Sequence, residues 1–117
     1  MSRRSDRVYV QHMLDACEKA ARYAAAVGYD GFLDDEPVQA LLIRQLEILG
    51  EVSARLSRTF VDAHPTWPWR EMKALRNYLI HGYDAVDLEQ VWATVESDLP
   101  GLAAKLRDAS VGEMGRF

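Results

Sequence analysis

The sequence has little cysteine and proline, and it contains no apolar run of the roughly 20 residues needed to cross a bilayer. Its one cysteine, Cys17, excludes an intrachain disulfide and a cysteine-based metal site, and it is typical of a reducing cytoplasm. The first residues, Met1 to Asp6, lead into an amphipathic segment and not into the apolar core of a signal peptide. We therefore expect a cytoplasmic protein with no membrane partner.

The chain also lacks an excess of positive charge, with 14 Lys and Arg against 18 Asp and Glu and a net charge of −4. A general nucleic-acid coat protein would be basic, so any contact with nucleic acid must be confined to a local surface. The hydrophobic content of 49% and charged content of 27% are ordinary for a globular protein. The length of 117 residues predicts one domain, 1–117.

Apolar residues recur at intervals of three and four along the chain, as on one face of a helix. This spacing predicts helices over about 6–26, 36–56, 57–63 and 68–81, and a last helix after residue 87. No repeat and no convincing strand is found. Because the connections are short, we expect an all-α antiparallel bundle of four to five helices.

Glycine and proline mark the points where these helices should break or approach one another. Gly28 is expected to end the first helix, before a loop over 29–34 whose Phe32 and Leu33 fold down onto the core. Gly50 lies inside the second helix, at a cost of about 1 kcal/mol relative to alanine, which a close approach of two helices would explain. Asp87 and Gln90 form a capping-box pattern, and Pro100 starts a new turn or kinks the last helix.

The most informative segment is Arg76-Asn77-Tyr78-Leu79-Ile80-His81-Gly82-Tyr83, at the expected end of a helix. Asn77 and His81 are four residues apart and therefore share a face, and the long side chain of Arg76 can swing towards them. Metal-independent cleavage of RNA needs proton transfer and positive charge on the phosphate. Histidine suits proton transfer near neutrality, and arginine offers a planar fork of donors that matches phosphate oxygens.

One histidine per chain supplies one proton-transfer group, so a two-fold dimer that faces two such clusters would supply the second. The pattern Arg76-Asn77-x-x-x-His81 at a helix end resembles the Arg-x4-6-His signature of HEPN-domain ribonucleases, and the longer form that ends in Tyr83 resembles the HepT toxin family. The resemblance extends over about residues 4–108, which predicts a HEPN-like core there and a flexible tail over 109–117. Its other parts are Arg44 to Glu51, Pro68 to Glu71 and Val86 to Pro100.

This resemblance implies the toxin of a toxin–antitoxin module, a homodimeric and metal-independent RNA endonuclease that needs no cofactor. Arg76, Asn77 and His81 would be its catalytic residues. The implied partner is an MntA-type nucleotidyltransferase antitoxin that transfers AMP to Tyr83, either within a larger hetero-oligomer or in a transient encounter. An added AMP would place bulk and negative charge where the substrate phosphate must lie.

Other features admit two interpretations each. Arg70 and Lys73 are either an RNA-binding track or a solvated helix face. Trp67 and Trp69 could stack on bases, but a hydrophobic staple at the helix entry is favoured. Glu47 and Glu51 could orient Arg76 or His81, although exposed salt bridges are the plainer account.

Three further residues have structural interpretations. Cys17 is interpreted as a core residue, and His12 and His64 as surface or loop residues. The rival function is a non-catalytic helical module that binds nucleotide or a nucleotidyltransferase.

Overall fold

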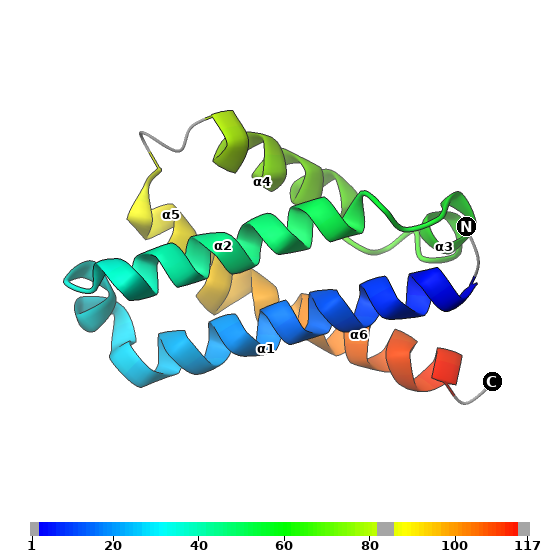
Figure 1. Cartoon of the computed structure of the whole chain (residues 1–117), viewed down its shortest axis with the longest axis horizontal. Coiled ribbons are helices and arrows are strands. Elements are labelled where there is room, and N and C mark those ends of the chain that lie inside the picture. Colours follow the sequence, from blue (N-terminus) through cyan, green and yellow to red (C-terminus); the bar gives the residue numbers. More distant parts are fainter. Residues whose placement is uncertain (1–2, 82–85, 115–117) are drawn as a thin grey trace.

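The computed structural model describes residues 3–81 and 86–114, and within them all regular structure is helical, as predicted. The elements are α1 (Arg3–Leu33), α2 (Glu36–Ser53), α3 (Arg58–Ala63), α4 (Trp69–His81), α5 (Leu88–Ala93), the π-helical turn η2 (Thr94–Asp98) and α6 (Leu99–Met114). Helix α1 lies between α2 and α6, and α4 packs on α2 (Figure 1). The described part of the chain contains no helix long and apolar enough to span a bilayer.

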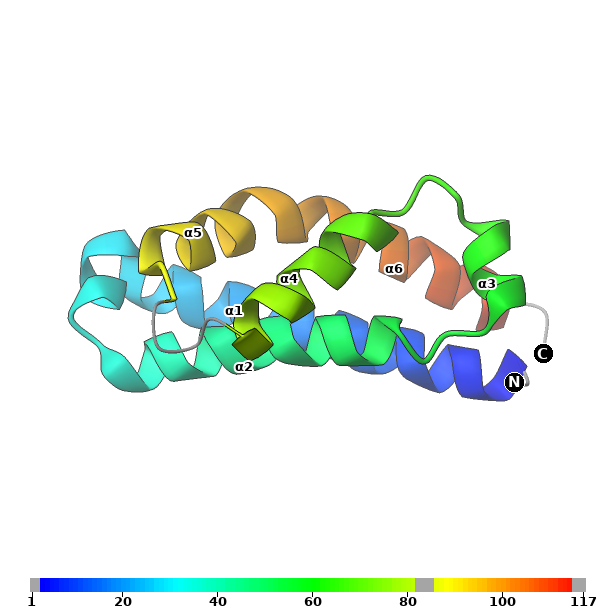
Figure 2. The same cartoon turned by 90° about the horizontal axis from the view of Figure 1, so that it is seen from above.

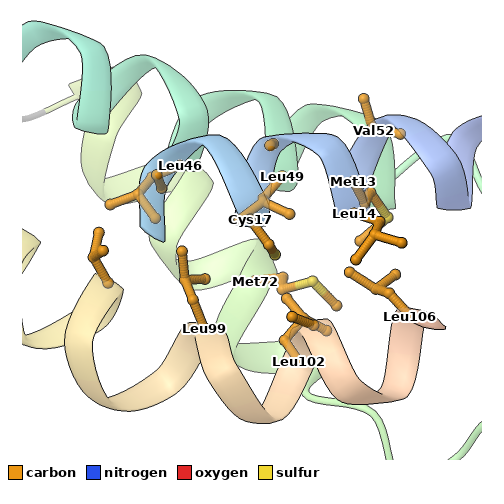
Figure 3. Packing of buried hydrophobic residues seen from close by; sticks show 14 of the residues in the cluster. Met13, Leu14, Cys17, Leu46, Leu49, Val52, Met72, Leu99, Leu102 and Leu106 are labelled. Carbon is orange, nitrogen blue, oxygen red and sulfur yellow. The ribbon is translucent and has the colours of Figure 1, made fainter. Parts of the chain in front are cut away.

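One hydrophobic core joins the helices (Figure 3). Its members come from the apolar faces that the spacing of three and four predicted, and they interdigitate between α1, α2, α4 and α6. Those that Figure 3 labels are Met13, Leu14, Cys17, Leu46, Leu49, Val52, Met72, Leu99, Leu102 and Leu106. Each is less than 9% exposed, so the burial that holds α4 on the bundle also holds any site that α4 carries.

The segment after Gly28 differs from the predicted loop. Gly28 does break the helix, with φ 71° and ψ 172°, a backbone conformation that residues with a Cβ rarely adopt. The helix then resumes over residues 29–33. Phe32 is completely buried and lies 5.2 Å from the Trp92 ring, whereas Leu33 remains 42% exposed. Thus one of the two apolar residues folds down as expected, and helical backbone is what carries it there.

The last predicted helix contains a wide turn. Asp87 caps α5, and its Oδ1 accepts hydrogen bonds from the backbone N–H groups of Glu89 and Gln90, which confirms the predicted cap. The π-helical turn then precedes Pro100, because a proline ring cannot accept the crowding of a regular helical turn. Helix α6 continues through Met114, so the helix includes residues that the sequence assigned to a tail from 109.

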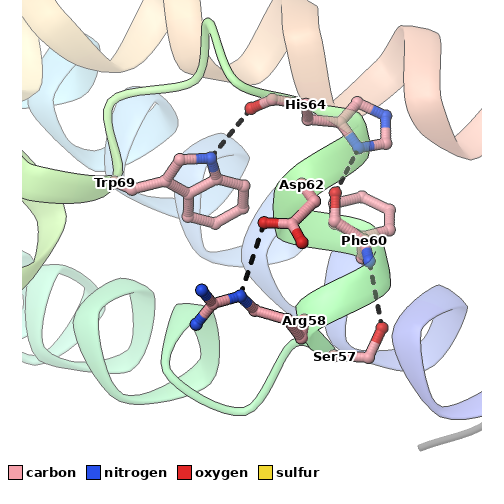
Figure 4. A network of polar contacts seen from close by, with 6 residues as sticks. All are labelled: Ser57, Arg58, Phe60, Asp62, His64 and Trp69. Atoms are coloured by element: carbon pink, nitrogen blue, oxygen red, sulfur yellow. Dashed lines mark hydrogen bonds and ion pairs between the residues drawn. The ribbon is translucent and has the colours of Figure 1, made fainter.

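The link between α2 and α4 is fixed by polar contacts and stacked rings (Figure 4). Ser57 caps α3, because its Oγ accepts from the N–H of Phe60 at 3.1 Å. The indole N–H of Trp69 donates to the carbonyl of His64 at 2.8 Å, and His64 stacks on Phe60. Trp67 is buried and stacks against Trp69, which confirms the structural interpretation of both tryptophans. This cluster determines where α4 begins.

Candidate functional site

Helix α4 carries the three residues that the sequence predicts to be catalytic, and it crosses α2 obliquely (Figure 2). The crossing is close at Gly50 of α2, as predicted. A Cβ atom built on Gly50 would lie 2.6 Å from the Cβ of Arg76, a separation that real side chains do not adopt. Arg76 therefore packs its stem directly on the backbone of α2.

The side chain of Arg76 is half-buried between α2 and solvent. Its Nε is inaccessible, and among the described residues no acceptor lies within hydrogen-bonding distance of it. Glu47 and Glu51 are instead within 3.9 and 3.8 Å of the Arg44 guanidinium, so they form the salt bridges that the sequence favoured. In the described part of the chain, no carboxylate forms an ion pair with Arg76, and its charge remains available to an anion.

Asn77 and His81 are exposed at the end of α4. At about 100° per helical residue, they are about 40° apart around the helix, whereas Arg76 is about 140° from His81 and has Asn77 between them. Arg76 thus lies at the edge next to α2, and the imidazole lies on the outer face. Within residues 3–81 and 86–114, no hydrogen bond joins any two of these three side chains, so their convergence on one phosphate stays a prediction.

The outer face of α4 is basic. Arg70 and Lys73 are both exposed there, on the side that Asn77 and His81 share. Glu71, which is the one acidic residue of α4, lies about 100° further round the helix, away from them. In a chain of net charge −4, this local cationic strip is where an RNA phosphate would be attracted.

Tyr83 and Gly82 lie outside the described residues, so the predicted modification site has no structural description. A contact nearby, which involves Tyr78, was not predicted from the sequence. The phenol oxygen of Tyr78 accepts a hydrogen bond of 2.8 Å from the backbone N–H of Asp87. This bond ties α4 to the start of α5. No local pattern predicts it, because the two residues are nine apart and one of them lies beyond the end of α4.

A groove of about 880 Å³ lies on the other side of α4, between α4 and the segment η2–α6. Leu75, Tyr78 and Leu102 are among its lining residues, whereas Arg76, Asn77 and His81 are not. The groove presents three carboxylates, from Glu71, Asp87 and Asp98, against the single cation of Lys105. Like charges repel, so this groove is unsuited to a polyanion, and the outer face of α4 is the better candidate for RNA.

Titratable clusters elsewhere are few. In residues 3–81 and 86–114, no group of three or more His, Cys, Asp or Glu side chains is arranged to hold a metal ion. Cys17 is buried in the core, and this burial raises the pKa of its thiol to about 12. The thiol is therefore protonated at neutral pH and unreactive, as expected of a core residue.

Comparison with known proteins shows where this arrangement belongs. The family described as "Ribonuclease HepT-like" matches residues 13–109, which include the whole of α4. The chain is 38% identical to the "Probable ribonuclease HepT" of Thermococcus cleftensis over 103 residues, which cover 88% of this chain and 94% of that protein. It is 32% identical to a candidate RNase of Methanocaldococcus jannaschii, over 86% of this chain and 92% of that one.

A third relative, a candidate RNase of Caldanaerobacter subterraneus, is 29% identical over 90% of this chain and 94% of its own length. No solved structure matched the chain. The family match covers well over half of the sequence, and the relatives align almost from end to end. The chain belongs to the HepT-like ribonuclease family.

Proposed function

We propose that the protein is an endoribonuclease that uses the outer face of α4 to bind and cut RNA without a metal ion. The RNA 2′-hydroxyl attacks the adjacent phosphorus, and the bond from phosphorus to the 5′-oxygen breaks. Proton transfer is assigned to His81, and charge stabilisation to Arg76, with Asn77 as a further donor. Family membership and the names of the relatives support this activity.

The observation that carries the proposal is the electrostatic character of α4. A guanidinium with no ion pair to a described carboxylate lies on the same helix as an exposed amide and an exposed imidazole, next to Arg70 and Lys73. A polyanion that follows this strip would pass from Lys73 to His81. The acidic groove on the other side of α4 favours neither RNA nor nucleotide.

We further propose that the active form is a homodimer. One chain offers one histidine on this face, whereas transesterification needs a base and an acid. Ile80 is 47% exposed in the middle of the same face, where an isolated apolar side chain gains from being covered by a second copy. Two-fold symmetry would then bring two copies of Arg76 and His81 to one cleft.

Regulation by a nucleotidyltransferase antitoxin is also proposed, with the protein as the toxin of the pair in the cytoplasm. AMP on Tyr83, two positions beyond His81, would place a phosphodiester beside the cationic strip and compete with the RNA backbone. The support here is the family resemblance of the motif that ends in Tyr83.

The test of catalysis compares RNA cleavage by the wild type with that by Arg76→Ala and His81→Ala. Each substitution should lower the rate by about 100-fold or more, because each removes a group that acts on the transition state. Arg58→Ala and His12→Ala are matched controls at exposed positions and should cleave normally. Equal cleavage by all five folded proteins, or none by the wild type, would favour the non-catalytic binding module.

Two further measurements test metal independence and modification. Cleavage should persist in excess EDTA, and its loss there would point to a metal-dependent mechanism. After co-expression with the neighbouring nucleotidyltransferase gene, the intact mass should rise by whole AMP units in the wild type and in Tyr23→Phe, but not in Tyr83→Phe. An unchanged mass gain in Tyr83→Phe would place the modification on another residue.

A further inference from the structure

Gly50 of α2 is the point on which the position of Arg76 depends. A Cβ at Gly50 would lie 2.6 Å from the Cβ of Arg76, 3.2 Å from its Cα and 3.3 Å from its Cγ. All three atoms belong to the backbone or to the rigid base of the side chain, so rotation about the outer bonds of Arg76 cannot relieve the overlap. Any side chain at position 50 must push α4 away from α2.

The other glycines of the described helices show that this contact is particular to Gly50. A Cβ added to Gly101 of α6 would have no atom within 4 Å, and at Gly31 the nearest atom is the Cβ of Val27 at 3.2 Å. Gly50 also has ordinary helical backbone, since within the described residues only Gly28 adopts a positive φ. Its lack of a side chain serves the approach of α4 rather than a special backbone conformation.

The approach also shapes the guanidinium. With the stem of Arg76 against α2, Nε is closed off from solvent and has no acceptor among the described residues. An inaccessible Nε cannot grip a phosphate, so recognition of an anion falls to the two terminal nitrogens. Their position is set by the packing of the stem, because burial removes much of the rotamer freedom of an arginine side chain.

We propose that Gly50 is a positioning residue for the ribonuclease reaction, and that it acts by letting Arg76 pack against α2 so that its terminal nitrogens meet the scissile phosphate. This inference rests on the proposed function. Misplacement of a catalytic group by about 1 Å can cost about 100-fold in rate. We therefore expect Gly50→Ala to lower kcat by about that factor, with a much smaller change in KM, because Arg70 and Lys73 still attract the RNA.

The test combines thermal unfolding with kinetics in two backgrounds. Alanine is a better helix former than glycine, so the matched variant Gly101→Ala should raise the Tm by about 4 °C and cleave RNA normally. Gly50→Ala should lower the Tm instead. In the Arg76→Gly background, which lacks Cβ and Cγ at position 76, Gly50→Ala should no longer lower the Tm.

Kinetics separate positioning from a general structural role. Guanidinium chloride at low millimolar concentration should restore part of the cleavage by Arg76→Gly, and adding Gly50→Ala should leave that rescued rate unchanged. A structural role would lower the rate in both backgrounds. The inference is overturned if Gly50→Ala cleaves RNA like the wild type, if it lowers the rescued rate as much as the native rate, or if the double variant does not fold.

Failure of the proposed function would look different. If the wild type cleaves no RNA, the ribonuclease proposal is refuted, while the unfolding temperatures of the single and double variants still decide whether Gly50 and Arg76 are in contact.

Discussion

Asp6 offers a quantitative test of how α1 holds the segment that leads to α4. Its side chain is only 7% exposed, and it accepts two hydrogen bonds from Ser57, from the backbone N–H at 2.9 Å and from the hydroxyl at 2.6 Å. Hydrogen bonds to a charged group contribute about 1.5–3 kcal/mol each. The two share one partner and are not additive, so Asp6→Ala should lower the free energy of unfolding by about 3 kcal/mol.

Urea unfolding followed by circular dichroism measures this loss. With a denaturant slope of about 2 kcal/mol per molar, the midpoint should fall by about 1.5 M. Asp62→Ala is the matched control, since Asp62 pairs with Arg58 at 3.5 Å while their side chains are 66% and 90% exposed, and it should cost less than about 0.5 kcal/mol. Equal midpoints for Asp6→Ala and Asp62→Ala would refute the role given to the buried carboxylate.

Three other substitutions should have distinct effects on stability. The pKa of Cys17 is raised by burial from 9.0 to about 12, so the wild type should lose about 1.4 kcal/mol of unfolding free energy per pH unit between those values, relative to Cys17→Ala, and nothing below pH 9; parallel pH curves would contradict this. Leu46→Ala should cost about 2–5 kcal/mol in urea unfolding, because the side chain is fully buried, and a smaller loss would mean that the core collapses into the cavity. Tyr78→Phe should cost about 1 kcal/mol by removing the acceptor for the Asp87 N–H, and an unchanged Tm would show that water replaces the phenol.

Much of the fold could be predicted from the sequence because helical periodicity and caps are local signals. The stripes of buried residues, the Asp87 cap and the close approach at Gly50 were all predicted. The helical backbone of residues 29–33 was not, because a glycine that breaks a helix says nothing about whether the chain resumes it. Packing of Phe32 against Trp92, sixty residues later, supports that short helical continuation.

The candidate site was predicted in part. The sequence identified the polar residues of α4, and the structure shows Asn77 and His81 exposed on one side of that helix. The closed position of Arg76 Nε and the bond from Asp87 to Tyr78 depend on how α4 meets α2 and α5, and no spacing within one helix encodes such contacts. A second copy of the chain, on which the proposed chemistry depends, lies equally beyond a sequence pattern.

The π-helical turn before Pro100 has a consequence for how insertions and deletions would be tolerated. A turn closed by the bond from the Leu99 N–H to the Thr94 carbonyl holds one residue more than a regular helical turn. That surplus residue keeps Val91, Val95 and Leu99 pointing to the same side despite two successive steps of four. Deleting one residue here would rotate everything downstream by about 100°, and the apolar side of α6 would turn from α1 towards water.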